Sequence, residues 1–192
     1  MTGTQVAGAE TGSPAAGFET ELARRRVLAA WADSAQRFRE DANSEEDLVL
    51  GGYRDRLVVE LAQNAADAAQ RAGVPGRLLL RLTDDGPHGT LIAANTGAPL
   101  DLAGVRALAS LRASAKRGGD TVGRFGVGFS AVLAVTDAPA VRSTSGGVAF
   151  SADRTRELVR ELVTAAPELG EEVARRDGHV PILRLPLSLI HI

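Results

Sequence analysis

Apolar positions recur at two different periods along the chain and mark helices and strands. Residues 19–40 carry apolar side chains at helical spacing with Arg and Glu between them, which predicts one long amphipathic helix. The Leu-rich run 76–83 and the run 89–95 surround the turn Asp84-Asp85-Gly86-Pro87. This arrangement predicts two paired strands.

The remaining periodic segments are shorter. Asn43 and Ser44, followed by Glu46, indicate the start of another helix. Further elements are predicted as helices over 53–71, 101–110 and 155–163, a second hairpin over 140–151, and a closing strand over 179–185. Helices gathered against one face of a mostly antiparallel sheet make an α+β fold, here a two-layer α/β sandwich.

The helix over 53–71, which Gly73 should end, carries a narrow polar stripe. At ~100° per residue, Glu60, Asn64 and Asp67 fall within about one sixth of its circumference. Apolar residues occupy the rest of the wheel, so we expect the helix to be buried on nearly all sides. The stripe faces either solvent, as on ordinary surface helices, or a binding site.

A glycine-rich segment, Gly123-Arg124-Phe125-Gly126-Val127-Gly128-Phe129, precedes the apolar run 130–135. Glycines spaced three and two residues apart allow the backbone to turn its N–H groups toward an anion. The N-terminus of a following helix would point its amides at the same anion. The glycine order differs from that of dinucleotide-binding and P-loop motifs. A phosphate-binding loop and a plain flexible turn are both consistent with this segment.

A third candidate lies where the predicted strand 89–95 ends. Asn95, Thr96 and Gly97 form a polar turn at this point, and strand ends of this kind often carry ligand-reading side chains. The alternative is a plain turn, because Asn and Gly tolerate left-handed backbone.

The order and type of these elements resemble the GHKL superfamily of ATPases, which comprises DNA gyrase, heat shock protein 90, histidine kinases and MutL. The family's first motif, E-x-x-x-N-x-x-D-A, is matched by Glu60, Asn64, Asp67 and Ala68. The chaperone branch reads G-[QKR]-F-G-[VI]-G-F, which 123–129 matches without a gap, and a later V-x-S is matched by 141–143. The resemblance covers about 51–185 and is nearest to heat shock protein 90 and the sacsin-type proteins. It implies a Bergerat-type two-layer sandwich.

The resemblance also implies a role for each matched position, with ATP and Mg²⁺ as cofactors. Glu60 would be the general base that orients and deprotonates the attacking water. Asn64 would be the side-chain ligand of the Mg²⁺ ion that bridges the phosphates. Asp67 would lie toward the adenine, near Asn95 and Gly97. The phosphate loop would consist of Gly123, Arg124, Phe125, Gly126, Val127, Gly128 and Phe129.

Two positions depart from the family pattern. Asn95 stands where the family has an aspartate that accepts a hydrogen bond from adenine, and Pro99 replaces a nearby glycine. An uncharged acceptor contributes ~1 kcal/mol instead of the ~1.5–3 kcal/mol of a charged one. Val180 and Pro181 replace the Gly-Thr pair whose threonine supports the adenine pocket. These changes bear on nucleotide affinity and base preference more than on the class of protein.

The segment 111–120 is basic and rich in small residues, which is typical of a lid. Lys116 and Arg117 are its best candidates for reaching nucleotide phosphates. A solvated run of charges is the alternative. A nucleic-acid-binding patch with Arg106 and Arg124 is a third interpretation, but a net charge of −2 and the lack of interleaved aromatic residues argue against it.

Composition is consistent with one ATP-binding domain over 17–186 behind a disordered tail, 1–16. With 192 residues and 44% hydrophobic content, the chain can bury a core. It has no cysteine, which excludes disulfides and thiolate metal sites. The sequence offers neither a signal peptide nor an apolar run of bilayer length, so we expect a cytoplasmic protein with no membrane partner. The three histidines, His88, His179 and His191, are expected at the surface.

The last six residues, Leu-Ser-Leu-Ile-His-Ile (187–192), look foreign to the chain. They correspond to the codons CTG TCT CTT ATA CAC ATC, the end sequence of a transposon used to prepare sequencing libraries. We therefore expect 187–192 to be adapter-derived and the natural protein to continue beyond Pro186. An ordinary apolar terminal strand is the alternative.

Three functions follow from these expectations. The first is a chaperone-like ATPase domain that binds Mg-ATP and hydrolyses it slowly, with ATP or ADP and a client protein as partners and a dimeric full-length protein. The second is a histidine kinase catalytic domain, although such domains usually carry Asn where Glu60 stands. The third is a nucleotide-binding pseudo-enzyme that acts as an interaction or sensing module.

Overall fold

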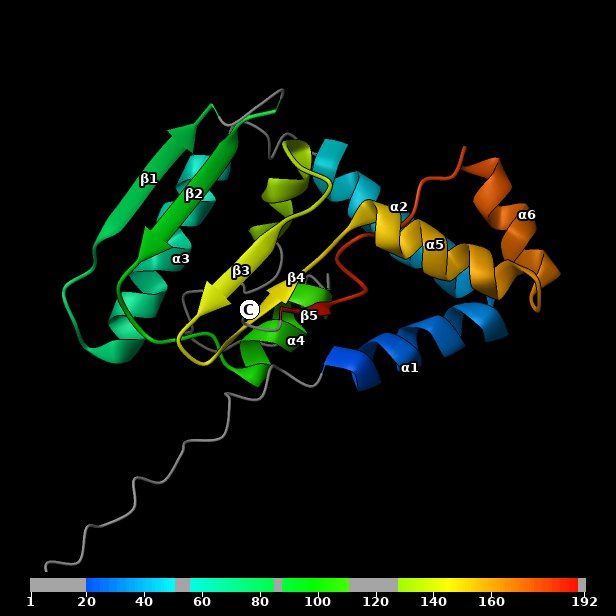
Figure 1. The fold of residues 1–192 in the computed structure, drawn as a ribbon, viewed down its shortest axis with the longest axis horizontal. Coiled ribbons are helices and arrows are strands. Elements are labelled where there is room, and N and C mark those ends of the chain that lie inside the picture. Colours follow the sequence, from blue (N-terminus) through cyan, green and yellow to red (C-terminus); the bar gives the residue numbers. More distant parts are fainter. Residues whose placement is uncertain (1–19, 51–55, 85–87, 111–127, 190–192) are drawn as a thin grey trace, which may run out of the picture.

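The computed structural model describes residues 20–50, 56–84, 88–110 and 128–189, and Figure 1 shows their arrangement. The helices are α1 (Thr20–Asp33), α2 (Ala35–Leu50), α3 (Leu57–Ala72), α4 (Leu102–Ser110), η2 (Phe129–Ala134), α5 (Ala152–Val163) and α6 (Pro167–Arg175). The strands are β1 (Leu78–Thr83), β2 (Thr90–Asn95), β3 (Ala140–Ser143), β4 (Gly146–Ala149) and β5 (Leu187–Leu189). This mixture of helices and antiparallel strands confirms the α+β class.

The described strands form two separate antiparallel sheets. β1 and β2 make a two-stranded sheet in which Leu78 lies opposite Asn95 and Thr83 opposite Thr90. β3, β4 and β5 make a three-stranded sheet in that order. Both expected hairpins are therefore confirmed, with β3 and β4 shorter than the predicted segments.

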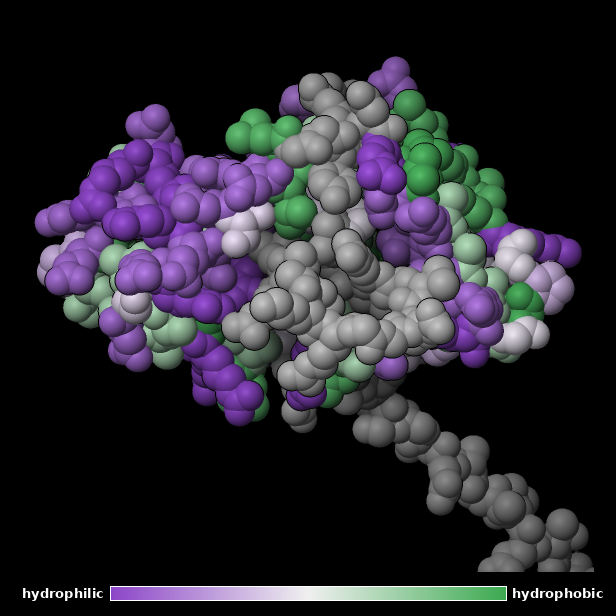
Figure 2. Space-filling model, turned by 180° about the vertical axis from the view of Figure 1, so that it is seen from behind, coloured by the Kyte–Doolittle hydropathy of each residue, from purple (hydrophilic) through white to green (hydrophobic). Residues whose placement is uncertain are grey.

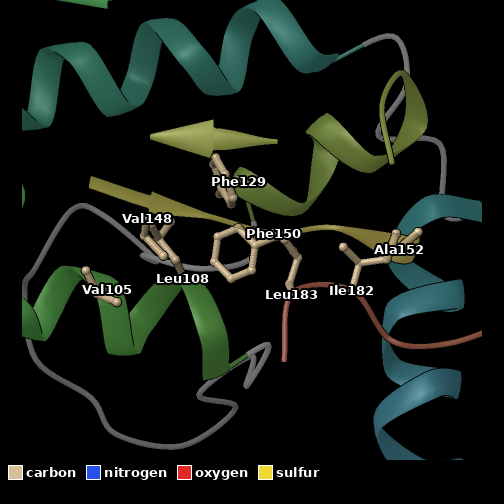
Figure 3. Close-up of a cluster of buried hydrophobic side chains, with 8 residues drawn as sticks. All are labelled: Val105, Leu108, Phe129, Val148, Phe150, Ala152, Ile182 and Leu183. Carbon is tan, nitrogen blue, oxygen red and sulfur yellow. The ribbon is translucent and has the colours of Figure 1, made fainter. Parts of the chain in front are cut away.

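Two apolar clusters form the core, and each joins a different set of elements. The first lies between α4, η2, β4 and the segment before β5, as Figure 3 shows. Its buried members are Val105, Leu108, Phe129, Val148, Phe150, Ala152, Ile182 and Leu183. The second joins α1, α2, α5 and α6 through Trp31, Phe38, Val159, Ala166, Leu169, Val180 and Leu185. The Trp31 and Phe38 rings meet edge to face, with 5.2 Å between their centroids.

The expected single helix over 19–40 is wrong, because the chain breaks at Ser34 into α1 and α2. The Ser34 hydroxyl accepts a hydrogen bond from the backbone N–H of Arg37 at 3.3 Å and so caps the start of α2. The helix start expected at Asn43 and Ser44 is also wrong, since both lie inside α2. The Ser44 hydroxyl donates instead to the carbonyl of Glu40, one turn earlier, at 2.7 Å.

Three other helical predictions hold. The motif helix is α3, and Gly73 ends it with a left-handed φ of 63°. The helices expected over 101–110 and 155–163 are α4 and α5. The helix α6 lacked a prediction, although Pro167 at its first turn is a favourable start.

The closing strand expected over 179–185 is wrong. The backbone N–H groups of Ile182 and Leu183 both donate to the carboxylate of Glu45 on α2, at 2.6 and 2.9 Å. Successive N–H groups of a strand point to opposite sides, so one carboxylate cannot receive two of them from a strand. Glu45 therefore holds this segment as a turn, and the strand β5 forms only after it.

The exposure of the histidines differs in part from the prediction that all three lie at the surface. His88 is exposed as expected, whereas His179 is half-buried, with its Nε2 at 3.7 Å from Glu46 Oε1. His191 lies outside the described residues. Of the helices that the structure describes, none combines the length and the apolar character needed to cross a bilayer.

Candidate functional site

The polar stripe of α3 is half-buried, as a site at the edge of a domain requires. Glu60, Asn64 and Asp67 are each partly accessible. The helix is not buried on nearly all sides as expected: Val58 is 54% and Val59 48% exposed. The residues that α3 does bury are Leu57 and the small Ala65, Ala68 and Ala69. Small residues allow other backbone segments to approach this helix closely, and two segments do so.

The first close approach is at Gly128, the last glycine of the predicted phosphate loop. A Cβ built on Gly128 would overlap Glu60 Oε2 and lie 3.2 Å from Glu60 Cδ. Gly128 has φ −66° and ψ −37°, a conformation that any residue can adopt. The backbone at position 128 does not require glycine, and a larger residue there would have to displace the end of the Glu60 side chain. The structure thus brings Glu60 into contact with the loop that the sequence predicted as its partner.

The second close approach is at Gly97, in the turn that follows β2. Gly97 has φ +136°, and a Cβ there would lie 2.6 Å from both Ala68 O and Ala69 N. The next residue, Ala98, donates its backbone N–H to Ala68 O at 2.8 Å. The turn after β2 is therefore fixed on α3 one residue from Asp67.

Asn95 lies at the exposed end of β2, and its Nδ2 donates to the Thr96 carbonyl at 3.2 Å. The side-chain hydroxyl of Thr96 donates to the Pro75 carbonyl at 3.1 Å and accepts from the Arg77 backbone N–H at 3.0 Å. These bonds tie the strand end to the chain that leaves α3. Asn95 and Gly97 therefore lie on the same short turn, with Gly97 facing the helix.

Of the other predicted phosphate-loop and lid residues, the structure describes only Phe129. Phe129 is buried, and its ring centroid lies 6.0 Å from that of Phe150 in the core cluster of Figure 3. Its side chain therefore anchors the end of the loop in the core. The residues Lys116, Arg117, Gly123, Arg124, Phe125, Gly126 and Val127 lie outside the described residues.

Two serines that were not assigned a role hold the turn after β2 from its other side. The Ser143 hydroxyl accepts a hydrogen bond from the Leu100 backbone N–H at 2.9 Å. The Ser145 hydroxyl donates to the Leu100 carbonyl. Ser143 is the serine of the V-x-S motif, so that motif was visible in the sequence, but its partner was not. The pair ties the segment that follows β2 to the β3–β4 hairpin.

Within the described part of the chain, no three His, Cys, Asp or Glu side chains are close enough to hold a metal ion by themselves. A cation here would need most of its ligands from a bound molecule and from water. Mg²⁺ commonly binds in this way, with one or two protein oxygens plus phosphate oxygens. Asn64 can supply one such oxygen, and the carboxylates of Glu60 and Asp67 lie four residues before it and three residues after it on the same stripe.

Comparisons of the chain with protein-family models, with curated proteins and with solved structures gave no match. Function must therefore be inferred from the residues and their geometry.

Proposed function

We propose that this chain is the ATP-binding domain of a GHKL-type ATPase, nearest in kind to heat shock protein 90 and the sacsin-type proteins. The observation that carries the proposal is the contact of Glu60 with Gly128. The Glu60 carboxylate on α3 and the last glycine of the glycine-rich loop are in close contact, and a side chain at position 128 would have to displace that carboxylate. This contact supports the interpretation that the stripe and the loop belong to one site.

The contact of Gly97 with α3 indicates how long the proposed site is. Gly128 lies at Glu60, and the Gly97 turn lies at Ala68, eight residues further along α3. At ~1.5 Å per residue the two contacts are about 12 Å apart along the helix. This separation suits an extended nucleotide, with its phosphates at Gly128 and its base near Asp67, Asn95 and Gly97.

The residue types suit phosphoryl transfer to water. The reaction depends on positioning and on neutralising phosphate charge, and Mg²⁺ supplies that neutralisation when bound. The Asn64 amide oxygen would be its protein ligand. Glu60 would accept the proton of the attacking water, and a placed base of this kind contributes ~10²–10⁴-fold to the rate. Phosphates beside an ionised Glu60 would be repelled without a cation, so nucleotide binding should require magnesium.

The proposal includes the finer architecture of the family. In a Bergerat-type two-layer sandwich, β1–β2 and β3–β4–β5 would belong to one layer and the helices to the other. The hydrogen bonds from Leu100 to Ser143 and from Ser145 to Leu100 support this arrangement, because they tie the segment after β2 to the β3–β4 hairpin. A client protein, a cytoplasmic setting and a dimeric full-length protein belong to the same proposal.

A nucleotide-binding pseudo-enzyme is the second candidate. It is favoured by Asn95, which is exposed and uses its Nδ2 on its own turn at Thr96. An adenine-reading group without charge and without burial would bind the base weakly. The presence of Glu60 favours the ATPase over both this candidate and a histidine kinase domain.

Calorimetric titration with ATP, with and without magnesium, tests the proposal together with a phosphate-release assay. Wild-type protein should bind ATP only with magnesium and release phosphate slowly. Glu60→Ala should keep binding and lose ~10²-fold or more in turnover, whereas Asn64→Ala should lose the magnesium-dependent binding. Gln63→Ala is the matched control, because Gln63 is an exposed neighbour on α3 outside the stripe.

The outcomes separate the candidates. Magnesium-dependent binding with turnover that Glu60→Ala leaves unchanged would support the pseudo-enzyme. Absence of ATP binding by the wild-type chain, or equal binding by Asn64→Ala, would contradict the nucleotide site itself.

A further inference from the structure

A cavity lies away from the α3 stripe, between the beginning of α1 and α4. The beginning of α1 lies near α4 in Figure 1, and the cavity between them has a volume of about 220 Å³. Thr20, Leu22 and Arg26 line it from α1, and Leu102, Val105 and Arg106 line it from α4. Pockets for drug-sized ligands usually measure ~300–1,000 Å³, so this one suits a smaller molecule.

One polar group in this cavity is buried without a hydrogen-bond partner. Thr20 is only 2% exposed, and its Oγ1 makes no hydrogen bond within the described structure. A buried hydroxyl without a partner costs ~1–3 kcal/mol, so such groups normally meet a ligand or water.

Two arginines add full positive charge. The three consecutive arginines 24–26 have different partners. Arg24 donates a hydrogen bond to the Pro186 carbonyl at 3.2 Å, and Arg25 forms an ion pair with Glu21. Arg26 and Arg106, which both line the cavity, are exposed and have no ion pair among the described residues.

Two acidic groups close in sequence to this cavity, Glu21 and Asp101, have partners among the described residues. Glu21 pairs with Arg25, and Asp101 accepts the backbone N–H of Gly104 at 2.6 Å at the start of α4. Within the part of the chain that the structure describes, no carboxylate therefore pairs with Arg26 or Arg106, and their positive charge can meet an anion.

The rest of the lining is apolar. Leu22 and Leu102 are both partly open to solvent, at 53% and 38% exposure, and Val105 is buried behind them. An apolar wall favours a ligand that carries hydrocarbon next to its charge. It also disfavours a phosphate dianion, because removing two charges from water costs more than removing one.

We propose that this cavity binds a small organic carboxylate, with its charged head at Thr20, Arg26 and Arg106 and its compact apolar body against Leu22, Leu102 and Val105. The guanidinium forks can hold a carboxylate in a bidentate manner. The Thr20 hydroxyl donates the remaining hydrogen bond. The site is independent of the proposed nucleotide site, since it shares no residue with the α3 stripe.

The test uses benzoate as the probe and the amide resonances of the 192-residue chain as the readout. Benzoate should shift the resonances of Thr20, Val105 and neighbouring residues in a saturable way, with a dissociation constant of about 0.1–1 mM for so small a ligand. Arg26→Gln combined with Arg106→Gln should weaken binding roughly 10-fold or more. Arg160→Gln is the matched control and should bind like the wild type, because Arg160 is exposed on α5 and lies outside the lining.

Two further probes test separately whether binding depends on the negative charge of the ligand and on its apolar body. Benzamide has the same shape without the charge and should not bind, and inorganic phosphate should bind more weakly than benzoate. The proposal is overturned if benzoate produces no saturable shift, if benzamide or phosphate binds as tightly, or if the double variant binds like the wild type. Spectra of each variant without ligand show whether its fold is retained.

Discussion

The helical region of α1, α2, α5 and α6 buries its large side chains, whereas the region of α3, β1 and β2 leaves most of its own exposed. Trp31 and Phe38 in the helical region are fully buried, but Leu79 and Leu82 on β1 are 60% and 78% exposed. Figure 2 shows the difference as hydrophobic surface gathered on the side of α3, β1 and β2 and mostly hydrophilic surface on the opposite side. The helical region is thus expected to carry most of the stability, and the α3 region the candidate site.

The helical region also organises its charges. The Glu172 carboxylate accepts hydrogen bonds from Arg39 at 2.7 Å, Arg175 at 2.8 Å and Arg176 at 3.1 Å. The hydrogen bond from Arg39, with help from Arg176 and the charge of Arg175, lowers the pKa of Glu172 to about 2. A carboxylate held in this way stays ionised in ordinary buffers and links α2 to α6. In the α3 region, by contrast, the polar stripe is left half open for a ligand.

A Leu→Ala substitution in each region should show the largest difference in the free energy of unfolding. Leu169→Ala in the helical region should lower the free energy of unfolding by ~2–5 kcal/mol, because Leu169 is 1% exposed and its removal leaves a cavity. Leu82→Ala should change it by at most ~0.5 kcal/mol, since most of that side chain already meets water. Urea denaturation of both variants measures the difference. Equal losses would mean that the α3 region is as tightly packed as the helices.

A second pair of variants compares a glycine that touches a helix with one that does not. Gly97→Ala should cost ~3 kcal/mol, because its φ is +136° and the new methyl group would overlap the α3 backbone at Ala68. Gly178→Ala should cost only ~1 kcal/mol, because φ is +76° but nothing lies within 4 Å. Thermal unfolding of both variants checks the order. A smaller loss for Gly97→Ala would show that the turn after β2 is not fixed on α3.

Sequence patterns succeeded where the determinant is local. Gly73 ends α3 because a left-handed residue is needed there, and that need is visible in the sequence alone. The β1–β2 hairpin follows from two Leu-rich or Ile-containing runs around one turn. The polar stripe was also visible, because Glu60, Asn64 and Asp67 share a face of any helix.

Sequence patterns failed where a distant residue decides. The segment 179–185 has a strand-like composition, but Glu45, 137 residues before Ile182, accepts its backbone N–H groups and turns it. The break at Ser34 was missed because apolar spacing continues on both sides of it. Burial of α3 was overestimated because β1 and β2 cover less of the helix than a complete sheet would. The contact of Gly97 with Ala68 likewise depends on packing that no short motif reports.

The contact between Glu60 and Gly128 can be tested as a coupling energy. Gly128→Ala should lower the free energy of unfolding by ~1–2 kcal/mol, because the Glu60 carboxylate would have to move away from the new methyl group. Glu60→Ala removes that carboxylate, so Gly128→Ala should cost little in the Glu60→Ala background. The four proteins of this double-mutant cycle, compared by urea denaturation, should show ~1 kcal/mol or more of coupling.

Gln63→Ala provides the control for the cycle. Gln63 lies on α3 but is exposed, and it is not among the atoms that a methyl group on Gly128 would meet. Its effect should therefore add to that of Gly128→Ala within ~0.5 kcal/mol. Additivity in the Glu60 cycle as well would remove the observation on which the proposed nucleotide site depends.

The smallest expected effect is a pH dependence that comes from Glu45 in the helical region. Burial raises the pKa of Glu45 to about 7 from 4.5, although hydrogen bonds from Ile182 and Leu183 and the charge of Arg184 oppose the rise. Asp41, whose carboxylate lies 2.9 Å from Arg184, adds a negative charge that favours the protonated form. The folded chain therefore binds this proton more tightly than the unfolded chain does.

The sign of the effect follows from this difference in pKa. The stabilisation is fully present below about pH 4.5 and is lost as the pH rises through 7. Between pH 5 and 8 the wild type should lose about 1–2 kcal/mol relative to Glu45→Gln, whose side chain stays neutral. Glu40→Gln on the same helix should keep the wild-type dependence, because Glu40 is exposed. If urea denaturation gives Glu45→Gln the same slope with pH as the wild type, then another group in the helical region titrates and Glu45 is already ionised in its turn.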